Sequence, residues 1–154
     1  MTDFRNVLVA TDFSEPAARA VDFAVELARK FDARLTLLHV YHIPTQAYAY
    51  EVVMPLEAFA KSAQKQLDAE LAGLRMRYPN CEGLVELGRP AERIVATADK
   101  RSVGVIVMGT HGRRAVSRFL LGSVAERVVR TSKVPVLTVP SELSETIAKT
   151  GTAT

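Results

Sequence analysis

The stretch Val103-Gly-Val-Ile-Val-Met108 is a short apolar segment, and the basic loop Gly109-Thr-His-Gly-Arg113 follows it directly. After Gly112 nine residues intervene before Gly122-Ser123, where the pattern predicts the start of a helix. A strand, a glycine loop and a helix start bring main-chain amides together in the way that phosphate-binding loops do. This stretch therefore predicts an α/β fold and, within it, a candidate anion site.

Apolar segments of strand length alternate with amphipathic helical segments along the rest of the chain. Strands that are apolar on both faces and alternate with helices are typical of a parallel sheet covered on two sides. With right-handed crossovers, the pattern predicts a doubly wound, Rossmann-like α/β fold. The expected strands are Asn6–Ala10, Arg34–Val40, Gly83–Leu87, Val103–Met108 and Val134–Val139, and the expected helices begin near Ser14, Pro55, Pro90 and Ser123.

Length and composition indicate one ordinary globular domain, expected over residues 1–140, with a polar tail over residues 141–154. Twenty Lys and Arg against 17 Asp and Glu give a net charge of +3, and the two signs are interleaved, which makes a nucleic-acid partner unlikely. The one cysteine, Cys81, excludes an intrachain disulfide and zinc sites built on paired cysteines. No membrane-spanning segment is evident, so we expect a cytoplasmic protein.

Two strand ends carry unusual residues. The first strand runs into Ala10-Thr11-Asp12, and the fourth runs into Met108-Gly109 and the basic loop. Open α/β sheets bind ligands at the carboxyl ends of their strands, where the strand order reverses. If these two strands are neighbours, both ends line one crevice. Asp12 has two readings, a turn or capping residue and an acceptor for ribose hydroxyls.

The helix expected after the basic loop begins with Ser123-Val-Ala-Glu126, which matches a capping box. We expect Ser123 to cap this helix without ligand and to donate to phosphate when ligand is bound. Gly122 has no Cβ and would let a phosphate approach the helix closely. The simpler alternative is a well-capped helix with no ligand. Gly109 and Gly112 are likewise either turn glycines with positive φ or parts of the phosphate loop.

The loop side chains suggest charge compensation. Arg113, Arg114 and Arg118 stand in a segment without acidic residues, and we expect one of them to pair with a triphosphate. His111 is a candidate phosphate donor; as a general base it lacks an identifiable orienting carboxylate. His39, within the second strand, is expected to be a packed core residue.

Several common site types are missing from the sequence. It contains no Gly-x4-Gly-Lys-[Ser/Thr] loop, no Gly-x-Gly-x-x-Gly after the first strand and no Gly-x-Ser-x-Gly elbow. It also lacks the His-x3-His and Cys-x2-Cys spacings of metal sites. P-loop enzymes, dinucleotide dehydrogenases and esterases of these types are thereby excluded.

The spacing Gly109-x2-Gly112-x9-Gly122-Ser123 resembles the nucleotide signature of the UspA-like universal stress protein family, in its ATP-binding subgroup. Val7-Leu-Val-Ala-Thr-Asp-Phe-Ser14 resembles the opening strand and turn of that family, and Val134-Pro-Val-Leu-Thr-Val139 resembles its last strand. The likeness covers nearly the whole chain. It departs at Gly104, where relatives often have aspartate, and this glycine is expected to loosen the turn before the strand.

The resemblance implies a five-stranded sheet of order 3-2-1-4-5 and a homodimer paired through the strand Val134 to Val139. It also implies a nucleotide-dependent regulatory or stress-response module that binds ATP, or ADP or AMP, with Mg²⁺ held through the phosphates and at most slow hydrolysis. The alternatives are a slow ATP hydrolase using His111 and an interaction scaffold with a vestigial site. The nucleotide-binding residues expected from the resemblance and the loop chemistry are Ala10, Thr11, Asp12, Val40, Met108, Gly109, His111, Gly112, Arg113, Gly122, Ser123 and Val124; no catalytic or metal-ligating residue is assigned.

Overall fold

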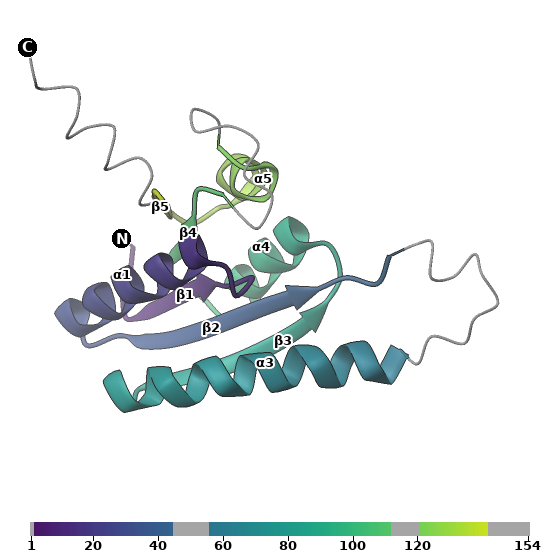
Figure 1. Ribbon diagram of the computed structural model, residues 1–154. Helices are drawn as coiled ribbons and strands as arrows, with labels where there is room; N and C mark the ends of the chain where they lie inside the picture. The colour runs from purple at the N-terminus through teal and green to yellow at the C-terminus, as the bar shows by residue number, and fades with distance from the viewer. Residues whose placement is uncertain (1, 45–55, 112–120, 142–154) are drawn as a thin grey trace, which may run out of the picture.

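The computed structural model describes residues 2–44, 56–111 and 121–141, and it contains a five-stranded parallel sheet flanked by helices (Figure 1). The strand order is β3-β2-β1-β4-β5, as expected. The elements in chain order are β1 (Asn6–Ala10), α1 (Glu15–Phe31), β2 (Arg34–Tyr41), α3 (Leu56–Arg77), β3 (Cys81–Leu87), α4 (Pro90–Lys100), β4 (Val105–Gly109), α5 (Ser123–Thr131) and β5 (Val136–Val139). The polar tail beyond residue 141 lies outside the described residues.

The inner strands are buried on both faces because alternate side chains enter two separate cores. Val7 and Val9 of β1 pack with α1 and α3, whereas Leu8 between them packs with α4 and α5. All three side chains are fully buried. Figure 1 shows the resulting layers, with α1 and α3 on one side of the sheet and α4 and α5 on the other. This explains why the strands read as continuous apolar runs instead of alternating ones.

The first helix begins where the sequence predicts it. Ser14 is the N-cap, and its Oγ accepts a hydrogen bond from the Ala17 N–H at 3.4 Å. Pro16 occupies the first turn, where its missing N–H costs no helical hydrogen bond. The helix ends at Asp32, which adopts a left-handed conformation and donates its N–H to the Ala28 carbonyl. Local residue choice therefore defines both ends of α1.

The strand β4 begins two residues later than expected, at Val105, and the reason lies at Gly104. The Gly104 N–H donates to the Asn6 carbonyl at 2.9 Å, and a Cβ at this position would overlap the Asp3 carbonyl. Glycine therefore lets the chain pass close against the N-terminal segment, and the expectation of a looser turn is wrong. Within the described residues no helix is long and apolar enough to cross a membrane.

Candidate functional site

The sequence left open whether the first and fourth strands are neighbours, and in the structure β1 and β4 lie side by side. Val7, Leu8 and Val9 pair with Val105, Ile106 and Val107 in parallel register. The strand order reverses here, since β2 follows β1 in the chain but lies on its other side. The carboxyl ends of β1 and β4 therefore lie side by side at the topological switch point, where open α/β sheets bind ligands.

The turn after β1 is held by its own side chains. Asp12 Oδ1 accepts the Ser14 N–H at 3.0 Å and also the Ser14 hydroxyl. The Thr11 N–H donates to the Leu38 carbonyl of β2, which extends the sheet pairing by one residue. Phe13 takes a left-handed φ of 63°, unusual for a non-glycine residue. The turn-forming role of Asp12 is thus confirmed, while its ribose-binding role stays a prediction.

The end of β4 and the start of α5 are in direct contact. The Gly122 N–H donates to the Thr110 carbonyl at 2.7 Å. A Cβ at Gly122 would lie 2.9 Å from that carbonyl oxygen and 3.3 Å from the His111 Cα. Glycine is therefore needed for close main-chain approach, with or without a ligand. The two segments that the sequence proposed to converge do converge.

Close packing against another segment also explains why residue 109 is a glycine. Among the described glycines only Gly88 has a positive φ, so the turn-glycine reading of Gly109 is wrong. A Cβ there would stand 3.2 Å from the main chain of Pro16, in the first turn of α1. The amino ends of α1 and α5 therefore flank the same strand end.

The prediction that Ser123 and Glu126 form a capping box is wrong. Gly122 is the N-cap of α5, Ser123 is already its first helical residue, and the described residues supply no side-chain cap. The Glu126 N–H bonds to the Gly122 carbonyl, and the Glu126 side chain pairs with Arg130 instead of turning back. The hydrogen bond from Gly122 to Thr110 sets the helix start, and this tertiary contact overrides the capping preference of serine. Among the described residues, no side chain accepts a hydrogen bond from the first amides of α5.

His111 stands where these segments meet. Its Nδ1 lies 3.0 Å from the Thr110 hydroxyl, while its Nε2 is buried and has no hydrogen-bond partner in the described part of the chain. A buried polar atom without a partner is costly, and a ligand oxygen would satisfy it. Gly112 and Arg113, predicted beside it, lie outside the described residues.

The predicted apolar contacts share one face of the sheet. Ala10, Val40 and Val124 are partly buried and pack against the core between the sheet and α4 and α5. Met108 belongs to the same core and is buried, with 6% of its surface exposed. The first three residues keep part of their surface exposed, whereas Met108 contributes chiefly packing.

Two residues that the sequence analysis did not assign to the site contact the turn after β1. Both carboxylate oxygens of Glu70, on α3, lie 3.4 Å from the Thr11 hydroxyl. Burial raises the pKa of Glu70, and the nearby Asp12 charge adds to the rise, although the Thr11 bond and the Arg77 charge oppose it. His39 is half-buried instead of being a core residue; its Nδ1 lies 2.9 Å from the Thr11 carbonyl oxygen.

The sequence held only a weak signal for these two residues. Glu70 lies on the largely polar surface of a long helix, and nothing local separates it from its solvated neighbours. His39 could have been suspected because it is an imidazole within an inner strand, close to the carboxyl end of that strand. The described residues contain no group of three or more His, Cys, Asp or Glu side chains that could hold a metal ion.

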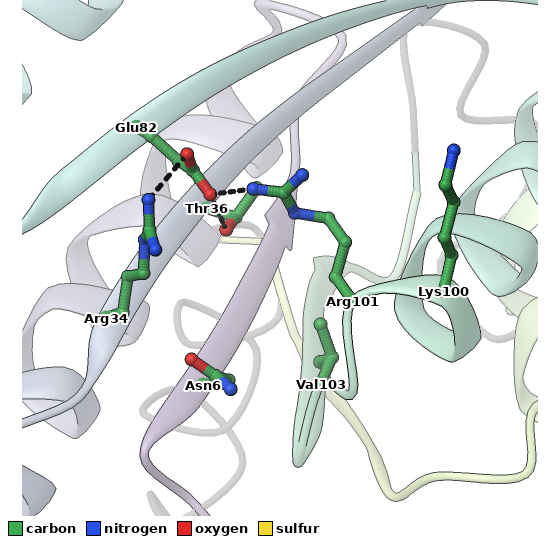
Figure 2. Close-up of a pocket in the computed structure, with 7 residues that line it drawn as sticks. All are labelled: Asn6, Arg34, Thr36, Glu82, Lys100, Arg101 and Val103. Atoms are coloured by element: carbon green, nitrogen blue, oxygen red, sulfur yellow. Dashed lines mark hydrogen bonds and ion pairs between the residues drawn. The ribbon is translucent and has the colours of Figure 1, made fainter.

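A second polar cluster lies at the opposite, amino edge of the sheet (Figure 2). A cavity of about 290 Å³ is lined there by residues at the strand starts and the end of α4: Asn6, Arg34, Thr36, Glu82, Lys100, Arg101 and Val103. Figure 2 shows Glu82 between Arg34 and Arg101. None of the predicted nucleotide-binding residues that the structure describes lines this cavity.

The carboxylate of this cluster is paired with two arginines of the chain. Glu82 bonds to Arg34 at 2.9 Å, to the Thr36 hydroxyl at 3.3 Å and also to Arg101. Burial alone would raise the pKa of Glu82, but the hydrogen bonds and charges of its partners outweigh burial and lower the pKa. The arrangement links β2, β3 and the end of α4 and has the character of a structural ion-pair cluster.

Comparison with known proteins agrees with the fold. The profile of the universal stress protein family matches residues 3–140. The universal stress protein MJ0531 of Methanocaldococcus jannaschii is 31% identical over 151 residues, which cover 92% of this chain and 85% of that protein.

Solved structures share the architecture. The hypothetical protein MJ0577 superposes with a TM-score of 0.77 at 26% identity, covering 91% of this chain and 98% of the other. A universal stress protein in complex with cAMP gives 0.68 at 27% identity (89% and 97% covered), and one from Archaeoglobus fulgidus in complex with dAMP gives 0.63 at 26% (90% and 98%). This chain belongs to the universal stress protein family.

Proposed function

We propose that this protein binds an adenine nucleotide at the carboxyl edge of β1 and β4 and acts as a nucleotide-dependent regulatory or stress-response module in the cytoplasm. The observation that carries the proposal is the contact between Gly122 and Thr110, which brings the amino end of α5, where no described side chain caps the helix, beside the end of β4. The relatives in complex with cAMP and dAMP support the adenine part. ATP is the proposed ligand, with ADP and AMP as alternatives.

The proposed binding mode divides the ligand between two chemistries. The partly buried Ala10 and Val40 offer apolar surface to the base, and Asp12 offers carboxylate oxygen to the ribose. The phosphates meet the first amides of α5 and its positive dipole end, at Ser123 and Val124. Gly112 and Arg113 are proposed to complete the phosphate loop. Mg²⁺ would bridge phosphate oxygens, a mode that needs no dedicated protein ligands.

Titration calorimetry with ATP, ADP and AMP, with and without Mg²⁺, tests the proposal, together with mass analysis of any nucleotide that copurifies. Binding of at least one adenine nucleotide at one site per chain is expected, and guanosine nucleotides serve as the control for base recognition. Absence of affinity for all three adenine nucleotides would contradict the proposal and favour an interaction scaffold with a vestigial site.

A slow ATP hydrolase is the second candidate, favoured by the buried, unpartnered Nε2 of His111. Positioned beside a phosphate, this nitrogen could accept or donate a proton. Replacement His111→Ala separates the two functions. Complete loss of hydrolysis with nucleotide binding retained would establish the hydrolase, whereas equal slow turnover in both proteins would exclude His111 as the reacting group.

We also propose that β5 pairs with a second copy of the chain. The N–H of Ile106 in β4 donates to the Pro135 carbonyl, and the N–H of Thr110, just after β4, donates to the Val139 carbonyl. Strand alternation therefore directs the main-chain groups of Thr138 away from β4. Proline is tolerated where an N–H points off a sheet edge, and it removes the donor that a partner strand would need. Thr138→Pro should therefore be folded but monomeric in light scattering. The control Thr138→Ala should stay dimeric, and a monomeric wild type at micromolar concentration would contradict the proposal.

A further inference from the structure

The turn that follows β1 is braced from outside by a side chain on another layer of the fold. Thr11 is buried, with 5% of its surface exposed, yet its hydroxyl meets a half-buried carboxylate from α3. Both oxygens of Glu70 lie 3.4 Å from the Thr11 Oγ. Glu70 and Thr11 are 59 residues apart in the chain, so only the tertiary fold brings them together.

The carboxylate determines which way the Thr11 hydroxyl points. An ionised carboxylate can only accept hydrogen bonds, so the Thr11 hydroxyl must donate its proton to Glu70. Its lone pairs then face the Phe13 N–H, which donates to the Thr11 Oγ at 3.1 Å. This bond helps to hold Phe13 in its left-handed conformation. Such a conformation costs free energy and persists only where surrounding contacts impose it.

A second support comes from β2 and acts on the same turn. The Nδ1 of His39 lies 2.9 Å from the Thr11 carbonyl oxygen. The ring centroids of His39 and Phe13 are 4.3 Å apart. Contacts from Glu70 on α3 and from His39 on β2 therefore hold Thr11 and Phe13, the two neighbours of Asp12 in the chain. The position of Asp12 at the switch point depends on these contacts.

We propose that Glu70 is a positioning residue for nucleotide recognition: by fixing the Thr11 hydroxyl it holds the turn in the shape that presents Asp12 to the nucleoside. The inference rests on the proposed nucleotide-binding function. Glu70 itself touches no ligand in this scheme. Retaining a half-buried carboxylate beside Asp12 opposes folding, and a group kept under such conditions at the switch point of the sheet is a functional candidate.

The test compares variants that differ in the acceptor they offer to Thr11. Glu70→Leu removes the acceptor and should weaken nucleotide affinity about tenfold, because the turn then no longer holds Asp12 in the binding position. Glu70→Gln retains an acceptor oxygen and should bind within about twofold of wild type. Thermal melting of Glu70→Leu should be unchanged or higher, because a buried charge is removed, so the lost affinity would not follow stability.

The matched control is Glu57→Gln, which removes the same charge from an exposed position on the same helix and should leave affinity unchanged. A double-mutant cycle with Thr11→Val supplies the second test, since removing both partners should cost no more affinity than removing one. Additive losses, or wild-type affinity in Glu70→Leu, would overturn the inference. If Glu70→Leu does not fold, Thr11→Val against Thr11→Ser carries the test, and equal affinity of these two proteins would overturn it.

These outcomes are distinct from failure of the proposed function. Should wild-type protein bind no adenine nucleotide, the proposed function fails before any variant is compared. Should wild-type protein bind while the Glu70 and Thr11 variants bind equally well, the function stands and the positioning role fails.

Discussion

The two edges of the sheet use polar residues in opposite ways. At the amino edge, Glu82 is surrounded by Arg34, Arg101 and Thr36, and its charge is neutralised within the chain. At the carboxyl edge, the α5 amides have no side-chain cap and the His111 Nε2 has no partner among the described residues. Polar groups that satisfy one another stabilise a fold, whereas an edge with unmet hydrogen-bonding capacity can receive a ligand. The difference favours the carboxyl edge as the site.

The largest effect is expected from Gly122→Val, which should abolish nucleotide binding. The new side chain would collide with the Thr110 carbonyl and push the amino end of α5 away from β4. Because that carbonyl belongs to the main chain, some thermal stability should be lost as well. Calorimetry and thermal melting measure the two effects separately.

The matched control for this glycine lies in α3. Gly73→Val adds the same atoms where no heavy atom lies within 4 Å of the new Cβ, and it should leave nucleotide affinity unchanged. Unchanged affinity in Gly122→Val would count against the carboxyl edge as the phosphate site, and with it against the contrast between the two edges.

A smaller effect should separate the two helix starts at the carboxyl edge. Ser14 caps α1, so Ser14→Ala should lower the free energy of unfolding by about 1 kcal/mol. Ser123 does not cap α5, so Ser123→Ala should change stability by less than about 0.5 kcal/mol while weakening nucleotide binding. Urea titration and calorimetry provide the measurements. A stability loss in Ser123→Ala as large as in Ser14→Ala would restore the capping box that the structure excludes.

The smallest expected effect is on the pH dependence of folding stability, where one glutamate from each edge can be compared. The pKa of Glu82 is lowered in the folded chain, so its ionised form adds stability above the pKa of the unfolded chain, and that stability is lost as pH falls through the folded pKa. The pKa of Glu70 is raised, so its ionisation opposes folding fully above the folded pKa, and the penalty is relieved as pH falls through that value.

The two glutamine variants should therefore differ in sign at neutral pH. Glu82→Gln should be less stable than wild type by at most about 1 kcal/mol, since Arg34 is largely solvent-exposed and the pair is screened. Glu70→Gln should be equally or more stable. Both differences should shrink under acidic conditions, and denaturant titrations at several pH values would show it. Two curves of the same sign would remove the electrostatic contrast between the edges.

Local patterns predicted the parts of this protein that depend on neighbouring residues. Ser14 and Pro16 marked the start of α1 correctly, and apolar runs located all five strands within about two residues, the usual error of such boundaries. The strand order came from resemblance to a family and not from periodicity. The expected nucleotide contacts remain predictions, and those at Gly112 and Arg113 fall outside the described residues.

The sequence by itself determined an alternating α/β chain with strands buried on both faces, because hydrophobic periodicity is a local property. Only the tertiary structure decided that Gly122 is the N-cap of α5 in place of Ser123, since the Gly122 N–H donates the deciding hydrogen bond to the Thr110 carbonyl, just after β4. It alone also brought Glu70 to Thr11, across 59 residues. Contacts between distant segments depend on how the helices pack on the sheet, and no local pattern records them.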